Sequence, residues 1–407
     1  MRILISTYGS RGDVEPMAAL AVALQAIGVE APVSAPPDQE FKDLVARAGA
    51  PLAPAFSSVR DWVATAKQLR LPLPQLAARM ITAQYDHLLA AAEGCDAIVA
   101  TGLFPSKAAA QSIAEKLGVR YVSVHYCPRY LPSRRHPPVE FPGWPHPPGM
   151  TDNAALWAFN AQAMNGLFGD AVNSHRAAIG LETTDNVRDL TFTRRPWLAC
   201  DPVLGPWEPT DLIDAIEAGA WILPDTRPLA ADLRAFLEKG PPPIYVGVGS
   251  MAMQAAPDAA RTAIEAIRAQ GRRIVLARGW AALDAIDDRD DCFVVGDLNQ
   301  QALFPRVAAV VHHGGAGTTA AAARAGAPQL IVPQVADQPY WAGRVAELGI
   351  GAAHAGAVPS VGSLSAGLKE ALAEATAERA ASLAGKIRDD GAAVAAERLV
   401  TEIRGRR

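Results

Sequence analysis

Short apolar runs alternate with longer amphipathic stretches along the first half of the chain. ILIST at 3–7 predicts a buried strand, VEPMAALAVALQAIG at 14–28 a helix that ends at a glycine, and APVSA at 31–35 a second strand. The same alternation returns in three later segments, DAIVATG (96–102), KAAAQSIAEKLG (107–118) and VRYVSVHY (119–126). This order predicts a parallel sheet covered by helices on both faces, which right-handed crossovers make doubly wound.

The second half repeats the pattern of strand, glycine turn and helix. PIYVGVGS (243–250) predicts a strand that runs into a Gly-Ser turn, and RRIVLARG (272–279) predicts a strand that ends at a glycine. AAVVHHGGAGTTAAAARAGAPQLIVPQ (308–334) contains a complete strand, turn, helix and strand. We therefore expect an α/β protein with two Rossmann-like units in tandem.

The length of 407 residues exceeds what one hydrophobic core usually organises, which favours two domains. A polar, proline-containing stretch around 200–230 marks the boundary. We expect an N-terminal domain over 1–205, a linker over 206–230 and a C-terminal domain over 231–385. The alanine-rich, charged helix at 386–407 either stays on the second domain or packs back on the first, and its composition does not decide between them.

Residues 127–150 interrupt the alternation with eight prolines in 24 residues. Proline lacks a backbone N–H donor, so such a segment cannot form regular structure. Because it is also too long for an ordinary connection, it favours a functional loop over a surface excursion without a role.

Composition narrows the classes of partner. Hydrophobic residues make up 50% of the chain and charged residues 20%, as in soluble globular proteins. The 38 basic and 42 acidic side chains leave a net charge of −4 without long runs of either sign, which argues against nucleic acid or an anionic membrane as the main partner. We find no signal peptide, no apolar window long enough to span a membrane and no metal-like spacing of the four cysteines. These features predict a cytoplasmic protein with free, mostly buried thiols.

The clearest candidate for ligand binding is HHGGAGTT, between a buried strand and a helix. Parallel α/β sheets bind phosphates at such places, because glycines let backbone N–H groups approach the anion and the helix dipole favours negative charge. The candidate residues are His312, His313, Gly314, Gly315, Ala316, Gly317, Thr318 and Thr319. The motif is neither a Walker A loop nor a dinucleotide fingerprint, which argues against a Rossmann oxidoreductase. The alternative is a glycine-rich turn with two internally bonded histidines.

Two further segments could complete a site at the same sheet edge. Ser250 ends the turn GVGS and could donate a hydrogen bond to a phosphate. Asp337 and Gln338 follow the strand that ends 308–334, and together they offer acceptors and donors that suit sugar hydroxyls. Capping of the next helix explains Asp337 equally well.

Near the N-terminus, GSRGDVEP (9–16) places a carboxylate where a strand gives way to a helix. Asp13 or Ser10 could cap that helix by accepting hydrogen bonds from its unpaired N–H groups. Asp13 could equally act as a general base, which must lie within about 3 Å of the proton that it removes. The residue types alone leave both roles open.

Four ordered motifs together resemble the family 1 nucleotide-sugar glycosyltransferases, which have the GT-B fold. They are SRGDVEP, GAWILPDTRPL at 219–229, PPPIYVGVGS at 241–250, and VHHGGAGTT followed by VPQVADQPYWAGRV. The closest resemblance is to the bacterial vancomycin-group glycopeptide antibiotic glycosyltransferases, and it runs nearly end to end. It implies two Rossmann-like domains that face a central cleft, with the acceptor bound by the N-terminal domain and the sugar nucleotide by the C-terminal one.

The resemblance also implies roles for individual residues. Asp13 matches the catalytic base, His312 matches a histidine that contacts the donor diphosphate with His313 beside it, and Ser250 matches a serine that reaches the phosphates. The other donor-site candidates are Asp337 and Gln338 for the sugar hydroxyls, Ser10 and Gly12 in the first motif, the loop residues 314–318, and, as looser matches around the nucleotide base, Arg278, Trp280 and Val295.

The implied reaction is an inverting transfer of a sugar from a UDP- or TDP-sugar to a hydroxyl of a glycopeptide aglycone or a similar natural product. Asp13 accepts the proton of the attacking hydroxyl, and the glycine loop stabilises the leaving diphosphate. We find no DxD-like metal motif in a plausible position, so we expect no metal and no cofactor, the sugar nucleotide being a co-substrate. We also expect a monomer without stable membrane association. The alternatives are a sterol or lipid glycosyltransferase and a GT-B protein that binds a sugar nucleotide without catalysis.

Overall fold

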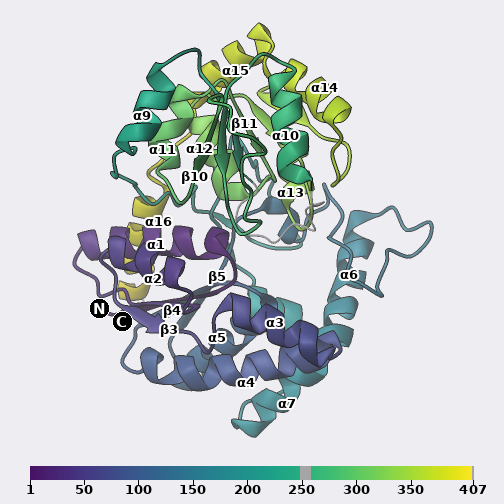
Figure 1. Cartoon of the computed structure of the whole chain (residues 1–407). Coiled ribbons are helices and arrows are strands. Elements are labelled where there is room, and N and C mark those ends of the chain that lie inside the picture. The colour runs from purple at the N-terminus through teal and green to yellow at the C-terminus, as the bar shows by residue number, and fades with distance from the viewer. Residues whose placement is uncertain (248–257, 406–407) are drawn as a thin grey trace. The chain divides into compact units, whose positions relative to one another are not determined.

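The computed structural model of the chain describes residues 1–247 and 258–405. The chain forms two compact units (Figure 1). The first contains Met1–Pro202, Pro206–Leu223 and Asp389–Arg407, and the second contains Val203–Gly205 and Pro224–Arg388. The main division therefore falls inside the stretch expected to be a linker, and the last helix is part of the first unit.

The first unit is built on a seven-stranded parallel sheet with the order β3-β2-β1-β4-β5-β6-β7. Its strands are β1 (Ile3–Tyr8), β2 (Val33–Ala35), β3 (Leu52–Pro54), β4 (Ala97–Gly102), β5 (Arg120–His125), β6 (Trp197–Leu198) and β7 (Ile216–Glu217). The four apolar runs of the first half form β1, β2, β4 and β5, so the parallel α/β fold expected there is confirmed.

Helices cover both faces of this sheet. Leu4 and Ile98 join Ile81 and Ile113 in one core cluster on the face covered by α4, α5 and α7, whereas α1 packs on β1 and β2. The helices of the unit are α1 (Arg11–Ala26), α2 (Gln39–Arg47), α3 (Val59–Leu69), α4 (Leu73–Ala92), α5 (Phe104–Leu117), α6 (Asn153–Met164), α7 (Asp170–Ala178), α8 (Val187–Phe192) and α16 (Gly391–Arg404), with η1 (Pro128–Tyr130) and η2 (Asn165–Gly169). Because neither face meets water, every residue of β1 is buried.

The last helix, α16, lies beside α1 (Figure 1). Its Glu402 forms an ion pair with Arg120 at the start of β5. Its first residue, Gly391, meets the turn at Gly219, because a Cβ at 391 would lie 2.6 Å from the Gly219 carbonyl carbon and 2.8 Å from the Ala220 nitrogen. The helix is thus an integral part of the first unit.

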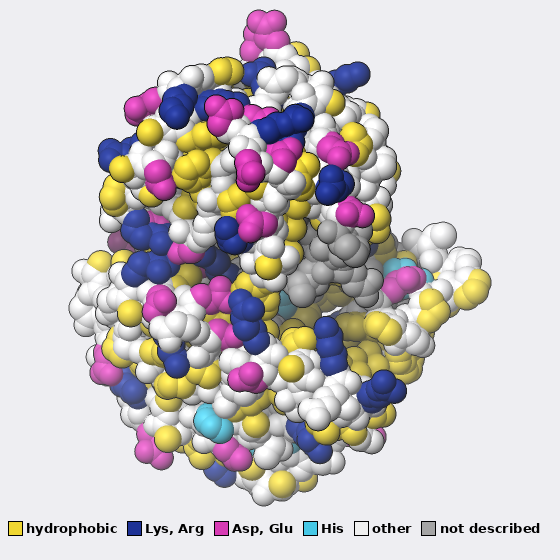
Figure 2. All heavy atoms as spheres, in the orientation of Figure 1, with side chains coloured by type: hydrophobic (Ala, Val, Ile, Leu, Met, Phe, Trp, Pro, Cys, Tyr) yellow, Lys and Arg dark blue, Asp and Glu magenta, His cyan; other side chains and the backbone are white. Residues whose placement is uncertain are grey.

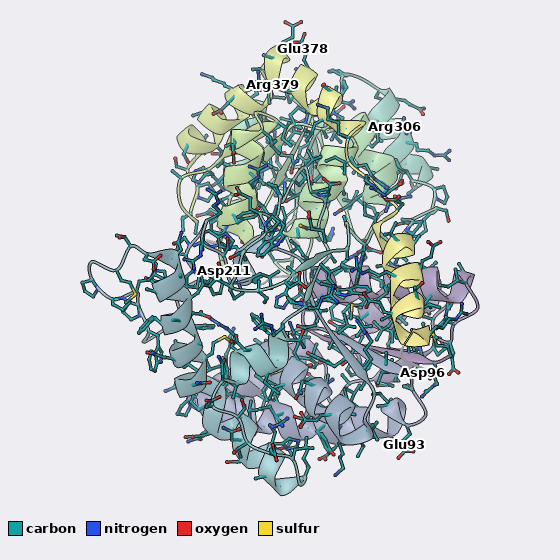
Figure 3. All side chains as sticks on the ribbon, turned by 180° about the vertical axis from the view of Figure 1, so that it is seen from behind. Glu93, Asp96, Asp211, Arg306, Glu378 and Arg379 are labelled. Carbon is teal, nitrogen blue, oxygen red and sulfur yellow. The ribbon has the colours of Figure 1, made fainter. Side chains whose placement is uncertain are left out.

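At the amino ends of the strands of the same sheet, Arg2 joins neighbouring segments. Its backbone N–H donates to Asp96 at 2.9 Å, and its guanidinium donates to the carbonyl of Glu93 at 2.8 Å; Figure 3 labels both acidic residues. The candidate residues of the first motif lie at the other end, where β1 ends.

The proline-rich segment 127–150 is irregular apart from η1 and one bridge between Phe141 and Trp144. It is held to the stretch after residue 205 by ion pairs, of which Arg134–Asp211 measures 2.7 Å. Asp211 is labelled in Figure 3. These contacts give residues 206–223 a structural role in the first unit.

The second unit has a six-stranded parallel sheet with the order β10-β9-β8-β11-β12-β13. Its strands are β8 (Ile244–Gly247), β9 (Ile274–Ala277), β10 (Cys292–Val295), β11 (Ala309–His312), β12 (Gln329–Ile331) and β13 (Gly351–Ala353). Its helices are α9 (Ala231–Glu238), α10 (Ala259–Arg268), α11 (Gln300–Leu303), α12 (Ala316–Arg324), α13 (Gln338–Glu347), α14 (Val361–Ala371) and α15 (Glu374–Ala384), with η3 (Phe304–Arg306).

Successive residues of β8 enter different cores. Ile244 and Val246 pack into one cluster with Ile264, and Tyr245 packs into another with Phe304. This alternation shows that both faces of the second sheet are covered, as the two-unit prediction requires. Acidic and basic side chains mix over the surface seen in Figure 2, in line with the small net charge. All four cysteines are free thiols, and three are buried, which confirms that expectation.

The contact between Gly391 and Gly219 can be tested by adding a single methyl group. Gly391→Ala should lower the free energy of unfolding by about 1–3 kcal/mol, the usual cost of overpacking. Gly405→Ala, where a Cβ would lie 3.5 Å from the Thr401 carbonyl oxygen, should change it little. Urea unfolding of both variants measures the difference, and equal stabilities would show that α16 does not depend on this contact.

Candidate active site

Three strands of the second unit, β9, β10 and β11, carry candidate residues at or directly after their carboxyl ends. His312, the last residue of β11, pairs with Gly247 of β8 on one side and Ile331 of β12 on the other. Arg278 directly follows β9, and its N–H donates to the carbonyl of Val295 at the end of β10, at 3.0 Å. His312, Arg278 and Val295 therefore lie at the carboxyl ends of the strands, where ligands bind in parallel α/β folds.

The glycine loop between β11 and α12 requires a glycine at 314. Gly314 has φ +91°, and a Cβ there would lie 2.7 Å from Cγ2 of Ile331 and 3.2 Å from the carbonyl oxygen of Gln338. The loop thus passes close to the next strand, and α12 begins directly after Gly315, its N-cap residue. The first N–H groups of α12, at Ala316 and the two residues after it, have no partner within the helix, as at every helix start.

The two adjacent histidines have different environments. His312 is buried; its Nε2 lies 2.9 Å from Oε1 of Gln329, and its Nδ1 accepts a hydrogen bond from the N–H of Gly314 at 3.1 Å. Since the amide oxygen only accepts, the proton is on Nε2. Burial, with a smaller effect of His313, lowers the pKa of His312 to about 3. The resemblance assigned the phosphate contact to His312, but both nitrogens of this ring already have partners within the protein.

His313 is half-buried, and its Nδ1 has no hydrogen-bond partner among residues 1–247 and 258–405. Burial lowers its pKa to about 4, and a hydrogen bond with the backbone of Gly247 partly opposes this shift. The ring lies over the glycine loop, because a Cβ on Gly315 would be 2.8 Å from Nε2 of His313. A neutral imidazole is therefore held beside the start of α12, with Nε2 facing the loop at Gly315 and Nδ1 buried.

Asp337 is the N-cap residue of α13, but its side chain makes no capping hydrogen bond. Its Oδ2 instead accepts a hydrogen bond from Nε1 of Trp341 at 2.7 Å. Burial raises the pKa of this carboxyl, and the bond from Trp341 acts in the opposite direction. The capping explanation for this side chain is therefore wrong, which leaves the explanation by sugar hydroxyls as a prediction.

Gln338 shapes the loop that carries Asp337. Its Oε1 accepts hydrogen bonds from the N–H groups of Gln334 at 2.7 Å and Val335 at 3.1 Å. Between Val335 and Gln338 the chain turns at Ala336, whose φ is +62°, a conformation that favours glycine. The amide oxygen of Gln338 therefore holds the turn that presents its neighbour.

The remaining candidates of the second unit are less constrained. The side chain of Arg278 pairs with Asp284 at 3.2 Å and is exposed, and Trp280 lies in the turn that follows it. A Cβ on Gly317 would meet no atom within 4 Å, so packing does not require that glycine. Ser250 lies outside the described residues.

In the first unit, Asp13 occupies the third position of α1, and Ser10 is the N-cap. Oδ2 of Asp13 accepts hydrogen bonds from the backbone N–H of Ser10 at 2.8 Å and from its hydroxyl at 3.3 Å, which completes a capping box. The helix begins three residues earlier than the apolar pattern predicted, because this box organises the polar sequence before it. The carboxylate is thereby fixed at the carboxyl end of β1.

Two neighbours of Asp13 were missed by the sequence analysis. Gly9 leaves room for the carboxylate, because a Cβ there would lie 2.6 Å from Cγ of Asp13. Tyr126, directly after β5, donates from its hydroxyl to the backbone carbonyl of Asp13 at 3.4 Å. A glycine four residues before an acid was a visible signal, whereas the approach of Tyr126 depends on the order of strands in the sheet. Gly12 has only an ordinary contact with Ser10.

Two searches for other kinds of site found none in the part of the chain that the structure describes. No group of three or more His, Cys, Asp or Glu side chains there could hold a metal ion. None of the helices there is long and apolar enough to cross a membrane.

Comparison with known proteins identifies the family. The family model described as erythromycin biosynthesis protein CIII-like, C-terminal domain, matches residues 281–403. Glycosyltransferase GtfE from Amycolatopsis orientalis is 52% identical over 405 residues, which cover 99% of this chain and 98% of the relative. Vancomycin aglycone glucosyltransferase from the same organism is 50% identical over 404 residues, with the same two coverages. The chain belongs to the vancomycin-group glycosyltransferases.

Solved structures agree on the fold of this glycosyltransferase. The glycotransferase of kitacinnamycin superposes with a TM-score of 0.73 at 19% identity, covering 99% of each chain. Glycosyltransferase VinC superposes with a TM-score of 0.68 at 19% identity, covering 100% of this chain and 99% of its own. The GT-B fold expected from the four motifs is confirmed.

The lowered pKa values of His312 and His313 predict that acid destabilises this glycosyltransferase. Both rings are neutral when folded but take up protons near pH 6.5 when unfolded, so stability is complete above that pH and is lost as the pH falls towards 4. When the pH falls from 7 to 5, each ring should lower the free energy of unfolding by about 1–2 kcal/mol. Unfolding of the second unit at both pH values measures this.

His313→Gln supplies the control for this pH dependence, because glutamine does not titrate. The variant should lose less stability between pH 7 and 5 than the parent chain. An identical loss in both proteins would show that His313 does not contribute.

Proposed function

We propose that this glycosyltransferase transfers a sugar, with inversion and without a metal ion, from a TDP- or UDP-sugar to a hydroxyl of a glycopeptide antibiotic aglycone. The observation that carries the proposal is the glycine loop of the second unit, with the imidazole of His313 beside the start of α12. The acceptor class is supported by the relatives, which include a vancomycin aglycone glucosyltransferase.

On the donor side, the diphosphate binds at the start of α12. The N–H groups from Ala316 onward point at an anion there, and the helix dipole favours its charge. Nε2 of His313, the ring nitrogen that faces the loop, donates a hydrogen bond to it. These groups stabilise the negative charge that develops on the leaving nucleoside diphosphate, which is the task a metal ion performs in other enzymes. A thymidine nucleotide is supported by a dTDP-epi-vancosaminyltransferase at 47% identity and by VinC, solved in complex with dTDP.

His312 has a supporting role in this scheme. Its bond to Gln329 fixes the ring, and its Nδ1 holds the N–H of Gly314, so it sets the path of the loop from beneath. Asp337, presented by the turn that Gln338 holds, accepts hydrogen bonds from hydroxyls of the donor sugar.

On the acceptor side, Asp13 is the general base. The N–H of Ser10 fixes one carboxylate oxygen at 2.8 Å, which orients the carboxylate at the carboxyl edge of its sheet. As the acceptor hydroxyl attacks the anomeric carbon, its proton passes to Asp13 and the bond to the diphosphate breaks. One displacement inverts the anomeric centre, and no covalent sugar–enzyme intermediate forms.

A transfer assay read by mass spectrometry tests the reaction. A glycopeptide aglycone is offered TDP- and UDP-sugars in the presence of EDTA, with the parent chain and with Asp13→Asn. We expect a mass gain of one sugar from the parent chain and a loss of at least about 100-fold in rate from the variant, the usual contribution of a general base.

Three other outcomes would contradict parts of the proposal. A requirement for added metal would remove metal independence, and a product with the donor's anomeric configuration would remove inversion. Nucleotide-sugar binding without transfer to any glycopeptide aglycone would mean that the acceptor is of another class or that the protein binds the sugar nucleotide without catalysis.

Donor binding tests the assignment of His313. His313→Ala should raise the Kd for TDP or UDP about tenfold or more, because a hydrogen bond to a charged phosphate is lost. His354→Asn is the matched control, since His354 is a buried histidine of the same unit that bonds Gly356 and Ser363. It should affect stability and not affinity in isothermal titration calorimetry. Equal affinities in parent chain and His313→Ala would remove His313 from the donor site.

A further inference from the structure

Lys107 lies where neither folding nor the scheme above accounts for it. It is in the first turn of α5, and only 3% of it is exposed. Burial disfavours a positive charge, and so does the positive end of a helix dipole. A lysine at a position where both burial and the helix dipole disfavour its charge suggests a functional role for its amine.

The amine of Lys107 meets a small polar network. Its Nζ lies 3.0 Å from Nε2 of His125 and 3.5 Å from the carbonyl oxygen of Val124, and it stands 4.9 Å from the ring centre of Phe192. Burial, and then the charge of Lys107, lower the pKa of His125 well below its usual range, so this ring is neutral. Neutral His125 can accept a hydrogen bond from the ammonium of Lys107 at Nε2, so it holds Lys107 without carrying a charge itself.

The sheet places Lys107 and Asp13 at the carboxyl end of two adjacent strands. β1 and β4 are adjacent and parallel, with Tyr8 opposite Gly102 at their carboxyl ends. α1 and α5 begin shortly after these residues, and Asp13 and Lys107 both lie in first turns. Burial lowers the pKa of Lys107 to about 7, and the negative charge of Asp13 opposes this shift. Such an interaction is reciprocal, so the ammonium also favours the ionised carboxylate.

We propose that Lys107 is a positioning residue of the transfer reaction, whose buried ammonium keeps the carboxylate of Asp13 ionised and ready to accept a proton. The inference rests on the proposed role of Asp13 as general base. An acceptor that covers Asp13 removes water from the carboxylate, which by itself favours protonation. While it is protonated, the amine of Lys107 offsets that effect in a way that water no longer can.

Charged groups on the neighbouring helices have their own partners. Arg176 of α7 bonds Glu115, Arg188 of α8 bonds Asp189, and Arg11 of α1 bonds Glu15. On α4, Asp86 acts on the neighbouring Tyr85 and on His175 of α7.

Tyrosines on the neighbouring strands add no charge. Burial raises the pKa values of Tyr8 on β1, Tyr121 on β5 and Tyr126 after it, so all three stay neutral. These tyrosines therefore do not contribute a charge to the interaction of Lys107 with Asp13.

The test is the pH dependence of kcat/KM for Lys107→Met, which keeps the length of the side chain and removes its charge. We expect the acid limb to move up by about one pH unit, so that the rate on that limb falls about tenfold, while the plateau at higher pH is retained. Lys116→Met, the same change on the same helix at a site bonded to the Ile179 carbonyl, is the control and should leave the profile unchanged.

A direct titration of Asp13 keeps the inference testable apart from activity. In protein labelled with ¹³C at aspartate Cγ, the Asp13 signal is assigned by its loss in Asp13→Asn. Its pKa should be about one unit higher in Lys107→Met than in the parent chain. If Asp13→Asn retains full transfer activity, the proposed base role fails, and this titration still decides whether Lys107 acts on Asp13.

Thermal unfolding separates this role from a structural one. Removing a buried charge together with its amine should leave Lys107→Met at least as stable as the parent chain. An unchanged acid limb together with an unchanged Asp13 titration in a folded variant would overturn the inference.

Discussion

In a parallel sheet, all strands end at one edge, and the helices that follow them begin there. Each beginning presents N–H groups that no residue of the helix can satisfy, so this edge carries positive potential before any side chain is added. In the second unit this edge carries the glycine loop and the start of α12, with the neutral ring of His313 beside them. In the first unit the same potential suits the carboxylate of Asp13 and opposes the ammonium of Lys107, which makes that lysine dependent on the acid beside it.

The strands were predictable where burial on both faces gives a continuous apolar run, as in β1, β4, β8 and β11. β6 and β7 were not, because two residues each leave no pattern, and they exist only because Trp197 and Leu198 find partners on either side. The start of α1 was missed because Ser10 to Asp13 is polar in composition and is ordered by a capping box rather than by burial.

The sequence predicted the glycine loop at 312–319 as a candidate site, but it did not predict which of the two histidines is bonded within the protein. Two adjacent histidines look equivalent in sequence. They differ in the structure because Gln329, on the next strand, bonds His312 and not His313. Lys107 looks like an ordinary polar residue at a helix start until β5 and α8 close over it. When the role of a side chain depends on a partner distant in the sequence, only the fold reveals it. The role of a glycine in a local turn can be predicted from the sequence.

The position of α16 has a consequence for how the protein forms and evolves. Most of the first unit is synthesised before the second, but α16 is synthesised after it, so the first unit cannot finish folding until α16 has been made. Recombination with a relative at the junction near Leu223 would replace both the second unit and a piece of the first. A hybrid of that kind must therefore match a foreign Gly391 and Glu402 to the parental Gly219 and Arg120.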